Sequence, residues 1–114
     1  MIFENLSPGK VLKVHTQNSV YLIALVNEDK KLVAIQGGAY FPESRLTTLT
    51  GSSSSIESTF LLMGRIAIGY GLEVWRDLKK YPRPRIVTSA VKFVALIENP
   101  ALAEQLRREA MAFS

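Results

Sequence analysis

The sequence contains no cysteine, and this absence removes several classes of chemistry at once. Without a thiol the chain can form no disulfide framework, no cysteine-ligated zinc site, no iron–sulfur cluster and no cysteine nucleophile. Such a composition fits a reducing compartment, and residues 1–5 have neither the basic nor the apolar region of a signal peptide. We therefore expect a soluble, cytoplasmic protein.

Long apolar runs are also missing from the sequence. The longest, residues 60–70, is interrupted by Arg65 and is about half as long as a bilayer-spanning helix requires. We expect no membrane-spanning segment.

The sequence contains a single histidine, His15. A two-histidine metal site is excluded within one chain, and a Ser-His-Asp triad would have to use His15 with no nucleophile elbow around it. Residues 64–69 have the spacing that opens a phosphate-binding P-loop, but Tyr70 and Gly71 stand where Lys and Ser or Thr are needed. We expect no enzymatic activity, no cofactor and no metal ion.

The clearest pattern that is present covers residues 10–36. Three runs rich in Val, Ile, Leu and Tyr, at 11–15, 19–26 and 32–36, are separated by polar turns, which predicts an antiparallel meander. The middle run is apolar on both faces, so it should lie centrally under a second layer. That layer is either the sheet closing on itself or a helix laid across it.

The later strand signals are shorter and interrupted by glycine, serine and proline. No internal repeat or linker divides the chain, so residues 1–114 are predicted to form one domain. Further strands are predicted at residues 45–49, 59–68, 72–76 and 86–97, the last bent near 89–90, with a flexible loop at 51–55 and an exposed extended loop at 77–85.

The C-terminal segment changes to a helical period. Asn99 is a good N-cap, Pro100 suits the first helical position, and residues 101–113 are rich in strong helix formers. One apolar face of this helix either covers the barrel or packs against a second copy or another protein. In the second case the residues of the oligomer interface would be Leu102, Leu106 and Phe113.

Together these patterns predict an all-β (β-rich) fold. We expect a small antiparallel β-barrel or rolled sheet of about six or seven strands, followed by one C-terminal α-helix at residues 99–113.

Positive charge is concentrated in one segment. The net charge of the chain is +4, and residues 76–85 alone carry five basic residues against the single acid Asp77. An exposed basic loop with an aromatic residue can follow phosphates and stack on bases, although such a loop can also serve only solubility. The predicted nucleic-acid or polyanion site consists of Arg76, Lys79, Lys80, Tyr81, Arg83 and Arg85.

Trp75 precedes this loop and shares a predicted strand face with Glu73. It can therefore stack on a base or anchor a partner, or it can pack under a loop or under the C-terminal helix.

About a quarter of the chain, near its N-terminus, carries a family resemblance. The segment 6–10 (LSPGK), the following alternating apolar residues, Asn18-Ser19, Tyr21, Asp29 and Leu32 resemble the first motif of Sm and Sm-like RNA-binding barrels. The resemblance implies a small barrel of SH3-like or Sm-like shape. It does not extend to that family's RNA pocket, because the chain has Val33 in place of a base-binding Asn, Met63-Gly64-Arg65 in place of Arg before Gly, and Ala24-Leu25 in place of a mid-strand Gly.

The leading functional hypothesis is a non-catalytic binding or assembly module with a homo-oligomer or a protein partner. The alternative is binding of RNA or single-stranded DNA through the basic loop at residues 76–85.

Overall fold

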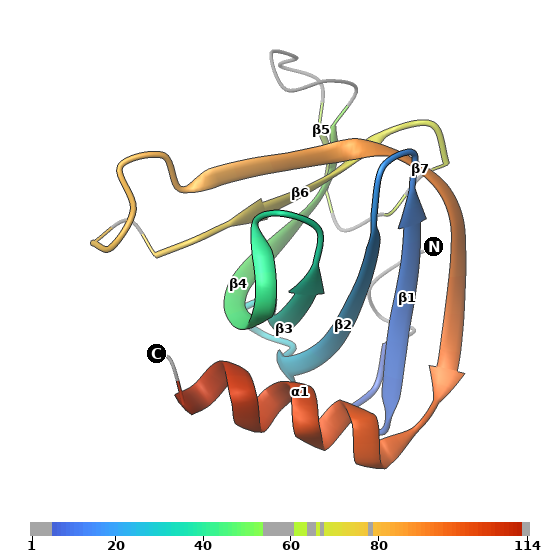
Figure 1. Cartoon of the computed structure of the whole chain (residues 1–114), viewed down its shortest axis with the longest axis vertical. Helices are drawn as coiled ribbons and strands as arrows, with labels where there is room; N and C mark the ends of the chain where they lie inside the picture. The colour runs from blue at the N-terminus through green and yellow to red at the C-terminus, as the bar shows by residue number, and fades with distance from the viewer. Residues whose placement is uncertain (1–5, 54–60, 64–65, 67, 78, 113–114) are drawn as a thin grey trace.

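The computed structural model describes residues 6–53, 61–63, 66, 68–77 and 79–112 of the chain. Within them, six antiparallel strands in the order β3-β2-β1-β7-β6-β4 close into a barrel, because β3 also pairs with β4 (Figure 1). The predicted small β-barrel with one C-terminal helix is confirmed. The elements are β1 (Lys10–Thr16), β2 (Val20–Asn27), β3 (Leu32–Gly37), β4 (Phe41–Ser53), β5 (Leu61–Met63), β6 (Gly71–Trp75), β7 (Arg85–Glu98) and α1 (Pro100–Ala112).

The barrel interior is filled by alternate residues of the strands. On β1, Leu12 and Val14 are fully buried in the core, while Lys13 and His15 on the opposite face are only half-buried. Since β2 lies between β1 and β3, its predicted central place is confirmed. The other core side chains are Leu6, Tyr21, Ile23, Val33, Ile35, Phe41, Leu49, Ile66, Leu72, Val74, Ile86 and Val91.

A second apolar cluster joins α1 to the outside of the barrel. Ala103, Leu106 and Ala110 pack with Val11, Ala24 and Ala34, which lie on neighbouring strands. These small side chains allow the helix to approach the sheet closely, and Leu106 is only 1% exposed. The sheet therefore closes on itself and also carries a helix across it (Figure 1).

The helix packs within its own chain, which decides where the suggested oligomer-interface residues lie. Leu106 is buried against the barrel, and Leu102 packs partly buried in the same cluster. A second molecule cannot contact Leu106 in this arrangement, and Phe113 lies outside the described residues.

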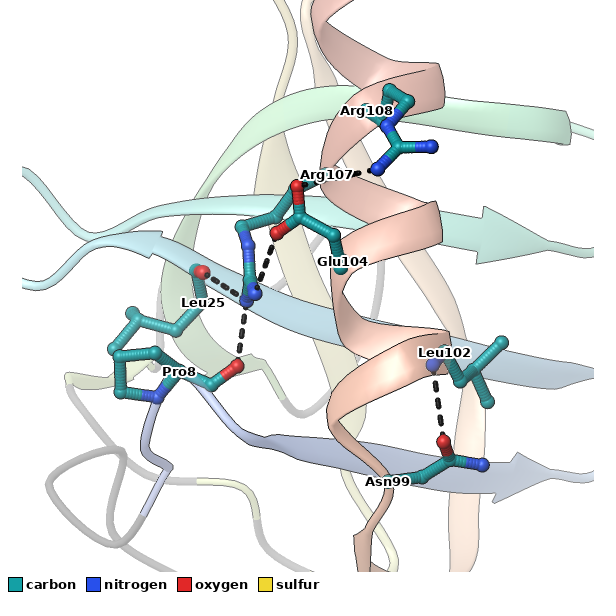
Figure 2. Close-up of polar contacts among 7 residues, drawn as sticks. All are labelled: Pro8, Leu25, Asn99, Leu102, Glu104, Arg107 and Arg108. Atoms are coloured by element: carbon teal, nitrogen blue, oxygen red, sulfur yellow. Dashed lines mark hydrogen bonds and ion pairs between the residues drawn. The ribbon is translucent and has the colours of Figure 1, made fainter.

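Polar contacts hold α1 at its N-terminus and near its middle. The side-chain oxygen of Asn99 accepts a hydrogen bond from the Leu102 amide at 3.0 Å. Asn99 therefore caps the helix, as predicted from the sequence. Arg107 donates to the carbonyl oxygens of Pro8 at 2.7 Å and Leu25 at 3.3 Å, and it forms an ion pair with Glu104 (Figure 2). The helix is thus tied to the lead-in of β1 and to β2.

β4 differs most from the sequence-based prediction. It runs for 13 residues, where the sequence predicts a short strand at 45–49 and a flexible loop from 51. Pairing with β3, β6 and β5 holds these polar residues in an extended conformation, and Gly51 (φ 152°) follows an irregularity in the β4–β6 register. Pairing on both edges stabilises a segment whose own composition is typical of a loop.

The strand predicted at residues 59–68 is confirmed only in small part, and the one at 86–97 agrees well with β7. Of the strand predicted at 59–68, β5 covers only three residues, and much of the rest lies outside the described residues. β7 pairs with β6 up to Ala90 and with β1 from Val91, and it curves at this point, close to the predicted bend (Figure 1). At the turn after β3 two backbone segments approach closely, because a Cβ at Gly37 would collide with the Val20 carbonyl oxygen.

No helix in the described part of the chain is long and apolar enough to cross a membrane.

We expect Leu106→Ala to lower the free energy of unfolding by about 2–5 kcal/mol, because it leaves a cavity between α1 and the barrel. Urea unfolding measures the change. The matched control is Gln105→Ala on the exposed face of the same helix, for which we expect a change within about 0.5 kcal/mol. A stable Leu106→Ala protein with an altered association state would instead place this side chain between molecules.

Candidate functional site

The basic segment forms the loop between β6 and β7. Residues 76–84 contain no strand or helix among the described positions, as the two prolines predict. Lys79, Lys80 and Arg83 are exposed, whereas Arg76 and Tyr81 are half-buried. The loop therefore exposes three of its cations to solvent, while Arg76 and Tyr81 are partly covered.

Arg76 organises the loop from inside. Its guanidinium lies over the Tyr81 ring, 4.1 Å from the centroid, and its Nη2 donates to the Arg83 carbonyl oxygen at 2.7 Å. The Arg76 amide also donates to the Pro84 carbonyl oxygen at 2.8 Å. These contacts connect the two sides of the loop and fix the tyrosine ring.

A cleft of about 620 Å³ separates this loop from the first half of β4. Its size lies within the range of about 300–1,000 Å³ that is typical of ligand sites. The charged residues that line it are Arg45 from β4 and Arg76, Asp77 and Lys80 from the loop, so cations outnumber acids by three to one.

Aromatic side chains share the same cleft. Tyr40 comes from the turn before β4, Phe41 from the first position of β4, Trp75 from the end of β6 and Tyr81 from the loop. Tyr40 is exposed, Trp75 and Tyr81 are half-buried, and Phe41 belongs to the barrel core. The cleft thus combines positive charge with aromatic surface, which suits an anionic ligand that carries flat rings.

Glu73 holds Trp75, one of the residues that line the cleft, in place. Its carboxylate is 3% exposed and accepts hydrogen bonds from Trp75 Nε1 at 3.2 Å and Thr50 Oγ1 at 2.8 Å. It also pairs with Arg85 Nε at 2.6 Å. Arg85 therefore neutralises a buried acid at the base of the loop, and the Trp75 ring is held in place by the same carboxylate.

Two polar atoms in residues that line the cleft are buried without a hydrogen-bond partner among the described residues. They are the hydroxyl oxygen of Thr47 and Nε of Arg76. A buried polar group left without a partner costs about 1–3 kcal/mol.

The structure brings together only part of the predicted site. Arg76, Lys80 and Tyr81 line the cleft, Lys79 and Arg83 stand on the exposed loop outside its lining, and Arg85 pairs with Glu73. The sequence did not predict that β4 would contribute to the site. The available signal was a charged residue, Arg45, at the start of a predicted strand.

The described residues include no group of three or more His, Asp or Glu side chains that could hold a metal ion. Comparison with protein-family models, with curated proteins and with solved structures found no match to this chain.

We expect Glu73→Gln to remove part of the acid sensitivity of folding. Burial alone would raise the pKa of Glu73, but the hydrogen bonds from Thr50, Trp75 and Arg85 and the charge of Arg85 outweigh it, so the pKa lies below its ordinary value of 4.5. The carboxylate therefore stabilises the fold above pH 4.5, and this contribution is lost as the pH falls through the folded-state pKa.

Urea unfolding as a function of pH measures this effect, with Glu28→Gln in an exposed turn as the control. The wild type and the control should lose stability below pH 4.5 more steeply than Glu73→Gln. Parallel pH profiles for all three proteins would contradict the assignment.

We expect Thr47→Val to raise the free energy of unfolding of the ligand-free protein by about 1–3 kcal/mol, because it removes a buried hydroxyl that has no partner. Thr50→Val makes the same chemical change at a hydroxyl that donates to Glu73, and it should lower stability. If Thr47→Val lowers the stability in thermal or urea unfolding, as Thr50→Val should, the Thr47 hydroxyl has a partner after all.

Proposed function

We propose that this protein is a non-catalytic binding module that holds single-stranded nucleic acid in the cleft between β4 and the 76–84 loop. The observation that carries the proposal is the presence of cations and aromatic rings on the walls of one cleft. Cations bind the phosphates of a nucleic acid, and aromatic rings stack on its unpaired bases.

The exposed cations of the loop supply the contacts to phosphate. Lys79, Lys80 and Arg83 form no ion pair with any described residue, so their charges are available to a polyanion. Each phosphate contact releases condensed counterions, which makes binding favourable at low salt.

The aromatic residues favour a single strand over a duplex. Tyr40, Trp75 and Tyr81 can contact a base only if its face is free, and the bases of a duplex are stacked on one another. A recessed cleft that is lined by rings suits a base that has left its stack.

An assembly role through α1 has less support from the contacts. Leu106 is already buried against the barrel, so a homo-oligomer or a protein partner would need a different surface. The loop and its cleft remain accessible in the single chain, and for this reason the nucleic-acid role is the one we propose.

Fluorescence anisotropy with labelled single-stranded RNA and DNA tests the proposal. We expect binding that weakens with salt, and we expect the triple change of Lys79, Lys80 and Arg83 to Ala to weaken it at least about tenfold at low salt. The slope of log K against log salt should become shallower by about 2, since three contacts to a single strand contribute about 0.7 each.

The control removes the same charge elsewhere, by changing the exposed residues Lys30, Lys92 and Arg108 to Ala. This protein should bind nearly as tightly as the wild type. Absence of binding at low salt, or an equal loss in both triple variants, would refute a specific role of the loop.

A further inference from the structure

The two edges of β4 are paired over different parts of the strand. On the first edge, β3 pairs with residues 41–48 of β4. On the second edge, β6 joins only from Thr48, which pairs with Trp75. Within the described residues, positions 41–47 have no strand on the second edge, and the cleft lies beside this part of β4.

The lining of the cleft shows that it meets β4 edge-on. Arg45 and Thr47 belong to one face of the strand, and Leu46 and Thr48 belong to the other, yet all four line the same cleft. Because successive side chains of a strand point to opposite faces, a cavity bounded by both sets lies along the edge between them.

The backbone groups that face the cleft follow from the strand register. The Leu49 amide donates to the Lys31 carbonyl oxygen at 2.9 Å, so the odd-numbered residues of this part of β4 direct their backbone groups to the β3 side. Backbone groups alternate between the two edges of a strand. The N–H and C=O of Leu46 therefore point to the second edge, into the cleft.

We propose that the backbone N–H and C=O of Leu46 hydrogen-bond to the edge of one unpaired base that stacks on the aromatic wall of the cleft. This inference rests on the proposed function and specifies how the ligand is held. Bases carry neighbouring donors and acceptors on their exposed edges, which complement one amide and one carbonyl on the same side of a strand.

The aromatic wall lies close to this pair of backbone groups. Trp75 is paired with Thr48, two residues along the strand from Leu46. Its indole N–H is held by Glu73 at 3.2 Å, so the ring is fixed before a ligand arrives. A preorganised ring saves the entropy of ordering it on binding.

An extended peptide that adds to this edge as a strand is less suited to it. Strand addition uses several alternate residues, but Pro42 has no N–H, and the Ser44 carbonyl oxygen already accepts from Arg45 Nη1 at 3.2 Å. Ser44 also does not line the cleft. Leu46 alone offers both groups there, which is enough for one base edge.

The first test compares three labelled oligonucleotides by anisotropy at one low salt concentration. One has an abasic sugar–phosphate backbone, one carries a single central uridine in that backbone, and one carries N3-methyluridine instead. We expect the uridine to tighten binding roughly 5- to 150-fold, as stacking of one base does. The N3-methyl group removes the donor of the base and should cost at least about fivefold.

The second test observes the backbone directly, by residue-resolved amide hydrogen exchange. In the free protein the Leu46 amide should exchange faster than the Thr47 amide, which faces β3. The uridine-bearing oligonucleotide should slow exchange at Leu46 at least about tenfold, and the abasic one should not.

A pair of variants separates the ring from the indole nitrogen. Trp75→Phe keeps an aromatic face and should retain most of the affinity gained from the uridine, whereas Trp75→Leu should lose it. Both variants remove the hydrogen bond to Glu73, so they are matched in that respect.

The outcomes are distinguishable. If none of the oligonucleotides binds, the proposed function fails together with this inference. If the abasic and uridine-bearing oligonucleotides bind equally, or if Leu46 gains no protection in the bound protein, only the inference fails. Protection of Leu46 by an acidic peptide and not by the uridine would assign the edge to strand addition and overturn it.

Discussion

The change of partner along β4 is the constraint on which the rest of the structure depends. Its first part pairs with β3 and its last part with β6, so this one strand closes the barrel. Because β6 begins to pair only at Thr48, the β6–β7 connection diverges from the first half of β4 and leaves a cleft between them. Closure of the barrel and formation of the cleft are therefore two results of the same register.

Among the described residues, no strand pairs with the second edge of the first half of β4, but α1 supports this part of the strand on its outer face. The Ser44 hydroxyl is fully buried and donates to the Leu106 carbonyl oxygen at 2.7 Å, which joins the strand to the helix. Leu46 packs in the same apolar cluster, and Ala110 reaches the lining of the cleft. The helix thus holds the cleft wall rigid, which gives its burial a role in positioning the ligand site as well as in stability.

Local patterns predicted the elements whose stability is local. The β1–β2 hairpin follows from the spacing of apolar residues along each strand, and the helix cap follows from Asn99 before Pro100. Both depend on neighbouring residues, so both could be predicted from the sequence. The length of β4 could not be predicted, because its serines and threonines are extended only by pairing with distant strands. The same limit applies to the cleft: the loop was visible as contiguous charge, but Arg45 and Thr47 reach it through tertiary structure, and the pairing of Arg85 with Glu73 left no local signal.

The pairing of β1 with β7 has a consequence for biosynthesis. Lys10 lies opposite Glu98, so the first strand of the barrel is completed by the last one. While the chain is being made, β1 and β2 can form a hairpin, but the other edge of β1 has no partner until β7 has left the ribosome. Pairings between residues far apart in the chain form slowly, and unpaired edges attract other strands. The nascent protein is therefore most exposed to aggregation until β7 has emerged and paired with β1, and the docking of α1 then covers the outer face of β1 and β2.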